Sequence, residues 1–334
     1  MADRQKLYEN PQGPGDARPT ALHIVQEEGL TNKLKDKVFL ITGCTSGIGV
    51  ETARALYTTG AKIFITARDV KRGEVVARQI DSNSDNKVEV LQLELDSLDS
   101  VRQGANEFLK RSRTLNVLVC NAGVMATPEG RTKDGFETQF GTCHLGHFLL
   151  FQLLKSTLLS SSTKEFSSRV VCVSSLGHRS GGVSFGDYNF EKSGYQPWKA
   201  YGQAKTANIY MANEIERRYG SKGLHANSLH PGGIATNLQV HVQDMMKKFE
   251  SNPEVMRTIM STEQGAATTV WAAIGKEWED KGGKYLENCS VSGPVKPEHR
   301  QGVNPGPGYA EHAFDVDAAK RLYEESLQMV SVNE

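Results

Sequence analysis

Tyr201 and Lys205 lie four residues apart in a segment, Tyr201 to Glu214, whose pattern predicts a helix. Residues at this spacing share one face of a helix, so we expect the phenol and the ammonium group to lie side by side. A nearby cation favours the anion of a phenol and lowers its pKa, which is otherwise about 10. Such a phenol can exchange a proton with a carbonyl or alcohol oxygen near neutral pH. The pair therefore indicates acid–base chemistry.

A glycine-rich turn lies upstream of this pair, between the apolar run Val38–Ile41 and a helix expected to begin at Ile48. Its glycines, Gly43, Gly47 and Gly49, keep side chains away from a helix N-terminus, where free amide groups and the helix dipole favour a phosphate. The spacing is GxxxGxG and departs from the general dinucleotide fingerprint GxGxxG. Taken alone, the turn is open to two interpretations: a pyrophosphate site, or a tight turn without a ligand.

The end of the next expected strand, Lys62–Thr66, bears on the choice of dinucleotide. An acidic residue there would bind a ribose 2′-hydroxyl, whereas an arginine accommodates a 2′-phosphate. The chain has Ala67 followed by Arg68, which favours NADP(H) and leaves NAD(H) as the second choice. The alternative is that Arg68 is a solvated residue at a helix start.

Two more segments suit the adenosine half of a dinucleotide. Asp96 follows the third expected strand, and we expect its carboxylate to accept a hydrogen bond from the adenine amine. The run Asn121, Ala122 and Gly123 follows the fourth, and would bring backbone close to the ribose.

Strand-like and helical stretches alternate through most of the chain, which is typical of a parallel sheet covered on both faces. The expected strands are Val38–Thr42, Lys62–Thr66, Val88–Leu93, Leu115–Cys120, Arg169–Ser174, Leu224–Leu229 and Gly283–Glu287. The expected helices are Ile48–Thr59, Lys71–Ile80, Leu98–Lys110, Gly135–Leu159, Tyr201–Tyr219, Thr262–Ile274 and Val316–Met329. The sequence therefore predicts a single α/β domain with a Rossmann-like, doubly wound parallel sheet of about seven strands.

Composition excludes several other classes of protein. The chain has 334 residues with 39 basic and 39 acidic side chains, so nothing suggests a nucleic-acid partner. It shows neither a signal peptide nor a run of about 18 apolar residues that would span a membrane. Its five cysteines contain no CxxC pair, which favours a reducing compartment. We expect a cytoplasmic protein with a small-molecule substrate; a homodimer is left open.

From Lys37 to about Cys289 the chain resembles the short-chain dehydrogenase/reductase family. The matching motifs, in family order, are TGCTSGIG (42–49), NAG (121–123), VSS (173–175), YGQAK (201–205) and HPGGIAT (230–236). The segments GTCHLGHFLL and VCVSSLGH are similar to the branch of retinol dehydrogenases and WW-domain oxidoreductases. We expect an N-terminal extension at 1–35, the family domain at 36–290 and a C-terminal extension at 291–334.

The resemblance implies a role for each matching residue. Tyr201 would be the general acid/base, Lys205 would lower its pKa and hold the nicotinamide ribose, and Ser175 would bind the substrate oxygen. Ile234 and Thr236 would contact the carboxamide and phosphate end of the cofactor. The expected cofactor-binding set is Gly43, Thr45, Ser46, Gly47, Ile48, Gly49, Arg68, Asp96, Asn121, Ala122, Gly123, Tyr201, Lys205, Pro231, Gly232, Ile234 and Thr236.

One catalytic position departs from the family pattern. Cys143 stands where the family has an asparagine that bends its helix and holds a proton-relaying water. A thiol is a weak donor and a weak acceptor, so we expect that it cannot replace the amide in both roles. Either the remaining catalytic residues suffice, or the scaffold serves a non-redox step. The nearby His144 and His147 lack a third metal ligand, so we expect core roles for them and no metal site.

The substrate pocket is expected to form from the loops 176–199 and 237–260 and from the stretch 291–309. Their aromatic and methionine side chains favour a lipophilic or polycyclic substrate of the kind met in secondary metabolism. The leading hypothesis is an NADP(H)-dependent oxidoreductase. The alternatives are a ligand-binding scaffold with a non-redox activity and an interaction protein without turnover, and the intact Ser175, Tyr201 and Lys205 argue against the last.

Overall fold

Short apolar segments pair side by side into one eight-stranded sheet in the computed structural model, which describes residues 4–81, 87–299 and 306–333. The strand order is β3-β2-β1-β4-β5-β6-β7-β8. All pairs are parallel except β7 with β8, which is antiparallel. The strands are β1 (Val38–Ile41), β2 (Lys62–Ala67), β3 (Val88–Gln92), β4 (Val117–Cys120), β5 (Ser168–Val173), β6 (Leu224–Leu229), β7 (Tyr285–Glu287) and β8 (Ser290–Val291).

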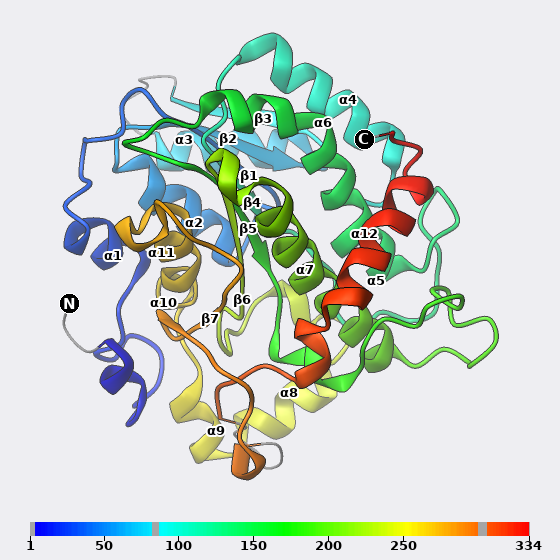
Figure 1. Cartoon of the computed structure of the whole chain (residues 1–334). Coiled ribbons are helices and arrows are strands. Elements are labelled where there is room, and N and C mark those ends of the chain that lie inside the picture. Colours follow the sequence, from blue (N-terminus) through cyan, green and yellow to red (C-terminus); the bar gives the residue numbers. More distant parts are fainter. Residues whose placement is uncertain (1–3, 82–86, 300–305, 334) are drawn as a thin grey trace.

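Helices cover both faces of this sheet (Figure 1). One face carries α1 (Ala21–Glu27), α2 (Ile48–Tyr57), α3 (Val70–Ile80) and α11 (Ala267–Ile274). The other carries α4 (Leu98–Arg111), α6 (Gly146–Ser161), α7 (Pro197–Tyr219) and α12 (Val316–Met329). The shorter helices are α5 (Thr138–Phe140), α8 (Gln243–Glu250), α9 (Pro253–Thr258) and α10 (Thr262–Gly265). The predicted doubly wound α/β domain is confirmed.

Alternation along the strands divides the core into two layers. In β1, Leu40 packs with α4, α6 and α7, whereas its neighbour Phe39 packs with α1, α2 and α11. Both side chains are fully buried because successive side chains of a strand point to opposite faces. The near-continuous apolar strands are therefore explained by helices on either side.

The eighth strand was not expected. A two-residue turn, Asn288 and Cys289, joins β7 to β8, and both residues have positive φ angles, 53° and 50°. Such turns usually carry Asn-Gly, so the missing glycine hid the hairpin. The Thr268 hydroxyl accepts a hydrogen bond from the Cys289 amide at 3.1 Å and helps to hold this conformation.

Two helix starts differ from the prediction by three residues or more. α7 begins at Pro197, four residues before the expected start, because proline suits the first turn of a helix. The helix expected from Gly135 begins at Thr138 and contains a π-helical turn, Gly141–Leu145, between α5 and α6.

All five cysteines are buried, and none forms a disulfide bond. In the part of the chain that the structure describes, no helix is long and apolar enough to cross a membrane.

Candidate functional site

The segments that follow β1, β2, β4, β5 and β6 meet at the carboxyl edge of the sheet, because these strands are parallel. This edge brings together the glycine turn, Arg68, the Asn121–Gly123 run, Ser175 and the loop 230–236. The order reversal between β1 and β4 lies at the centre of the edge, where ligands of such sheets bind.

Each glycine of the turn after β1 is required for a different structural reason. A Cβ on Gly43 would lie 2.8 Å from Ala122, and one on Gly49 would lie 2.5 Å from the Gly43 carbonyl oxygen. These two glycines are thus required by contacts within the protein, whereas we expected them to make room for a pyrophosphate. Gly47 is the N-cap of α2 with φ 68°, and no side chain caps this helix. The first amides of α2 therefore remain available for an anion.

Two arginines and three acidic residues line a cavity of about 410 Å³ at the end of β2. The lining residues are Thr45, Arg68, Asp69, Arg72, Glu94 and Asp96. Asp69 caps α3 by accepting from the Arg72 amide at 3.3 Å. Neither Arg68 nor Arg72 has an ion pair with another described residue. Arg72 was not identified from the sequence as a cofactor-binding candidate. Its position one helical turn after Arg68 could have indicated that the two side chains lie together.

Two buried oxygen atoms in this region have no hydrogen-bond partner among the described residues: Asp96 Oδ1 and Asn121 Oδ1. Buried polar atoms are nearly always paired, so an orphaned acceptor marks a place for a ligand or a water. Asn121 Nδ2 itself donates to the Thr42 carbonyl at 2.7 Å. The uncapped α2 end and the two arginines suit the phosphates of a dinucleotide, whereas the two unpaired acceptors suit donor groups such as its hydroxyls or its adenine amine.

The predicted neighbours Tyr201 and Lys205 are both buried in α7, at 3% and 4% exposure. The Lys205 ammonium lies 5.6 Å from the centre of the Tyr201 ring. It donates to the Val173 carbonyl at 3.1 Å, which ties α7 to the end of β5. The predicted juxtaposition is present in the structure.

The pKa of the Tyr201 phenol is nevertheless raised, not lowered. Burial raises it, and the charge of Lys205 and a hydrogen bond with Ser175 lower it by less. The sequence revealed the cation but not how deeply the phenol is buried. The contact with Ser175 places the predicted serine beside the predicted acid/base. The Ser175 hydroxyl also accepts from the Gly177 amide at 3.0 Å.

Cys143 lies in the π-helical turn, so the helix is distorted here without the asparagine. Its sulfur accepts a hydrogen bond from the Val124 amide at 3.4 Å, and its thiol donates one to the Val124 carbonyl oxygen at 3.6 Å. The thiol thus contacts both backbone groups of Val124. Burial raises the pKa of this thiol, so it stays protonated.

His147 connects Cys143 to the glycine turn. Its Nδ1 lies 2.9 Å from the Cys143 carbonyl oxygen and its Nε2 lies 2.8 Å from the Thr42 hydroxyl. The carbonyl can only accept, so Nδ1 carries the proton and Thr42 donates to Nε2. Burial lowers the pKa of His147 to about 4, which agrees with a neutral ring. His144 is likewise buried and contacts the Ser326 hydroxyl at 2.9 Å, so both histidines have core contacts.

Sequence reasoning missed Gly177 and His178. A Cβ on Gly177 would lie 2.5 Å from the Tyr201 ring, so only glycine lets this loop approach the tyrosine. His178 is buried: its Nδ1 lies 2.6 Å from the Ser175 carbonyl oxygen, and its Nε2 accepts from the Ala310 amide at 3.0 Å. The C-terminal extension is thereby joined to the segment that carries Ser175.

Glu287, at the end of β7, also binds the C-terminal segment. It is 2% exposed and accepts from the Gly308 amide and the Ser292 hydroxyl, each at 2.6 Å. Burial raises its pKa to about 7, against smaller opposing effects of these hydrogen bonds and of Arg179.

We expect Glu287→Gln to change how thermal stability depends on pH. The raised pKa means that ionised Glu287 is disfavoured in the folded state, so its contribution to stability is full below about pH 4.5 and lost as the pH rises through 7. Glutamine cannot ionise and keeps an oxygen that accepts both hydrogen bonds. The Tm of the native protein should therefore fall more between pH 5 and 8 than that of the variant. Parallel Tm curves would contradict this.

The expected pocket residues fall into two groups. Phe190 is buried, and Tyr188 stacks on Phe140 with ring centres 5.2 Å apart, so these two belong to the packing. Trp198 is 38% exposed and meets Tyr201 edge to face at 5.9 Å. α8 has no buried residue. Within the segment 291–309, residues 300–305 lie outside the described part of the chain.

Comparisons with known proteins agree with these motifs. A family model for short chain dehydrogenases matches residues 37–247. The short-chain dehydrogenase/reductase prx1 of Penicillium roqueforti is 53% identical over 323 residues, which cover 96% of this chain and 93% of the relative. Human retinol dehydrogenase 13 is 34% identical, with 89% and 85% covered. A crystal structure of an uncharacterised Mycobacterium paratuberculosis protein has a TM-score of 0.65 and 32% identity, covering 89% of this chain and 94% of that one.

Proposed function

Because the chain belongs to the short-chain dehydrogenase/reductase family, we propose that it is an NADP(H)-dependent oxidoreductase in which Tyr201 is the general acid/base. The observation that carries this proposal is the group of buried Tyr201 and Lys205 with partly buried Ser175, at the same edge of the sheet as an uncapped helix N-terminus. The reaction is reduction of a ketone or aldehyde, or the reverse oxidation of an alcohol.

Each residue of the group has a distinct task in this proposal. The nicotinamide, when bound, supplies or accepts the hydride at the substrate carbon. Ser175 donates a hydrogen bond to the substrate oxygen, and Tyr201 gives that oxygen its proton in the reductive direction. Lys205 opposes the effect of burial on the phenol, so that the proton can leave. The proton and the hydride together complete the reduction.

The preference for NADP(H) rests on the cavity at the end of β2. Arg68 and Arg72 both line it without an ion pair to another described residue, and a phosphate there could bind both guanidinium groups. Asp96 lines the same cavity with its unpaired oxygen, which suits a donor such as the adenine amine.

A lipophilic or polycyclic substrate is supported by Trp198. Its exposed ring lies against Tyr201, so a flat apolar substrate could pack on the indole while its oxygen reaches the phenol. Lining of this kind recognises shape and apolar area, with few polar groups to set orientation.

The proposal is tested by incubating the protein with NADPH and a panel of aromatic ketones. We expect absorbance at the NADPH band to fall with at least one ketone, and more slowly with NADH. The contrary result is that the protein binds the cofactor but neither oxidises NADPH with any ketone nor reduces NADP⁺ with any alcohol. That result would favour the non-redox alternative that Cys143 raises.

The variant Cys143→Asn tests whether the cysteine is merely tolerated at this position or is needed for a different reaction. The Val124 amide and carbonyl already face the sulfur, so an asparagine amide can take both bonds. We expect the variant to oxidise NADPH at an equal or higher rate with the ketone found in the panel. The rate and the Tm are measured together. A clear loss of rate at unchanged Tm would show that the thiol shapes a pocket for a different reaction.

A further inference from the structure

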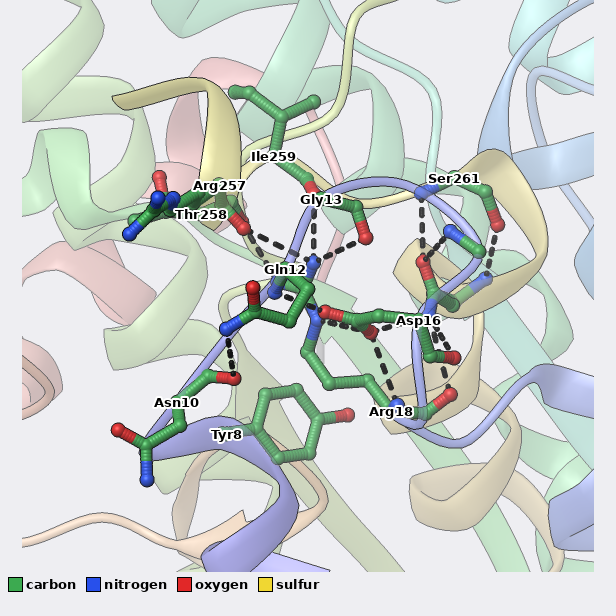
Figure 2. A network of polar contacts seen from close by, with 12 residues as sticks. Tyr8, Asn10, Gln12, Gly13, Asp16, Arg18, Arg257, Thr258, Ile259 and Ser261 are labelled. Carbon is green, nitrogen blue, oxygen red and sulfur yellow. Dashed lines mark hydrogen bonds and ion pairs between the residues drawn. The ribbon is translucent and has the colours of Figure 1, made fainter. Parts of the chain in front are cut away.

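Arg18, in the N-terminal segment 4–20, holds the end of α9 (Figure 2). Its side chain is 3% exposed and donates to the carbonyl oxygens of Thr258 and Ile259, each at 2.7 Å, and more distantly to that of Arg257. These carbonyls lie at the C-terminal end of a helix, which lacks intrahelical donors and favours a cation. Arg18 therefore caps α9 from a distant part of the chain.

The arginine is itself fixed by its own segment. Asp16 accepts from Arg18 Nε at 2.8 Å, and the Gly13 carbonyl accepts from Nη2 at 3.0 Å. Burial raises the pKa of Asp16, but the hydrogen bonds from Arg18 and from the Gln12 amide outweigh it and lower the pKa to about 2. The buried guanidinium is thus paired with a carboxylate that stays ionised, which offsets its desolvation.

A second connection reaches α10. Gln264 donates to Asp16 Oδ1 at 3.0 Å and to the Arg18 carbonyl at 3.2 Å, and it accepts from the Gly15 and Ser261 amides, each at 3.0 Å. The N-terminal segment therefore holds both ends of the short link between α9 and α10.

This link touches the loop that follows β6. The Met260 amide donates to the Gly233 carbonyl at 2.8 Å, and Met260 pairs with Ile234 in a parallel bridge. A Cβ on Gly232 would lie 1.7 Å from the Met260 methyl group, so the side chain packs directly on that glycine. A shift of the α9 end would displace Met260 and, with it, the loop 232–236.

We propose that Arg18 is a positioning residue for cofactor binding. It acts through the end of α9 and Met260 to fix the loop from Gly232 to Thr236, without touching cofactor or substrate. The inference rests on the proposed function in one respect, namely that this loop contacts the nicotinamide end of the cofactor. Under this proposal, the N-terminal segment contributes to cofactor binding without contacting the cofactor.

The test compares Arg18→Met with Arg4→Met in the full chain. Methionine keeps apolar length but removes the charge and the donors. Arg4 is a matched control because it lies in the same segment at 7% exposure, yet pairs with Glu27 and Glu28 at the C-terminal end of α1. We expect Arg18→Met to raise the Kd for NADPH by about tenfold, since small displacements of a binding group are costly. Amide hydrogen exchange should also accelerate at 257–262 and 232–236.

Arg4→Met should lower the Tm while leaving the Kd and exchange in these two segments unchanged. Arg18→Lys should recover part of the affinity because it keeps the charge without the planar fork, and it replaces the methionine variant if that one fails to fold. Native affinity and native exchange at 232–236 in the Arg18 variants would overturn the inference. If the native protein binds neither NADPH nor NADH, the proposed function fails, and exchange at 232–236 still decides whether Arg18 fixes the loop.

Discussion

Replacing Tyr201 with phenylalanine should lower redox turnover by at least about a hundredfold while the cofactor still binds. The phenolic hydroxyl is the only part of the side chain removed, and a positioned acid/base is worth about a hundredfold or more in rate. The ring remains to pack against Gly177 and Trp198, so the fold should survive. The measurement is the single-turnover rate of NADPH oxidation, with Kd from fluorescence titration.

The matched control is Tyr210→Phe. Tyr210 is on the same helix, is equally buried, and donates to the His312 carbonyl at 2.7 Å instead of facing the site. It should lose stability but little turnover. Near-native turnover in Tyr201→Phe would mean that the proton comes from another group, and the mechanism would be wrong.

Arg68→Ala should weaken NADPH binding by about ten- to hundredfold and NADH binding far less. Only NADPH carries the additional phosphate, and hydrogen bonds to a charged partner are worth about 1.5–3 kcal/mol. Arg72→Ala should act in the same direction because Arg72 lines the same cavity. The Kd values of both cofactors are compared for each variant.

Arg78→Ala provides the control for charge alone. Arg78 is on the same helix as Arg72 but faces solvent and pairs weakly with Glu74 at 4.0 Å. Neither Kd should change in this variant. Equal losses of NADPH and NADH affinity in Arg68→Ala would show that Arg68 acts on a part common to both cofactors, and no loss would show that it faces solvent. Either result would mean that the preference is set elsewhere.

The sequence was sufficient for the fold because its signals are local. An apolar run such as Val38–Ile41 can be buried only between two helical layers, and it became β1 in the interior of the sheet. The proximity of Tyr201 and Lys205 follows from helix geometry alone. The meeting of Ser175 with Tyr201 follows from parallel strands that end at one edge.

What the sequence could not supply depends on contacts between distant segments. The pKa of Tyr201 is set by burial under loops whose path no local pattern describes. The docking of His178 on Ala310, and of Arg18 on the end of α9, joins residues more than a hundred positions apart. The thiol of Cys143 reaches Val124 only because the π-helical turn presents it there.

Because every cysteine is buried, the reactivity of the thiols can be used to measure local opening of the protein. An alkylating reagent can reach a thiol only when the surrounding segment detaches, so the rate of modification measures local unfolding. Cys289 lies 3.5 Å from the Tyr8 hydroxyl and would report release of the N-terminal segment. Cys143 would report opening around Val124. Mass spectrometry of partially alkylated protein, with and without NADPH, would then rank these openings in one experiment and show which of them the cofactor suppresses.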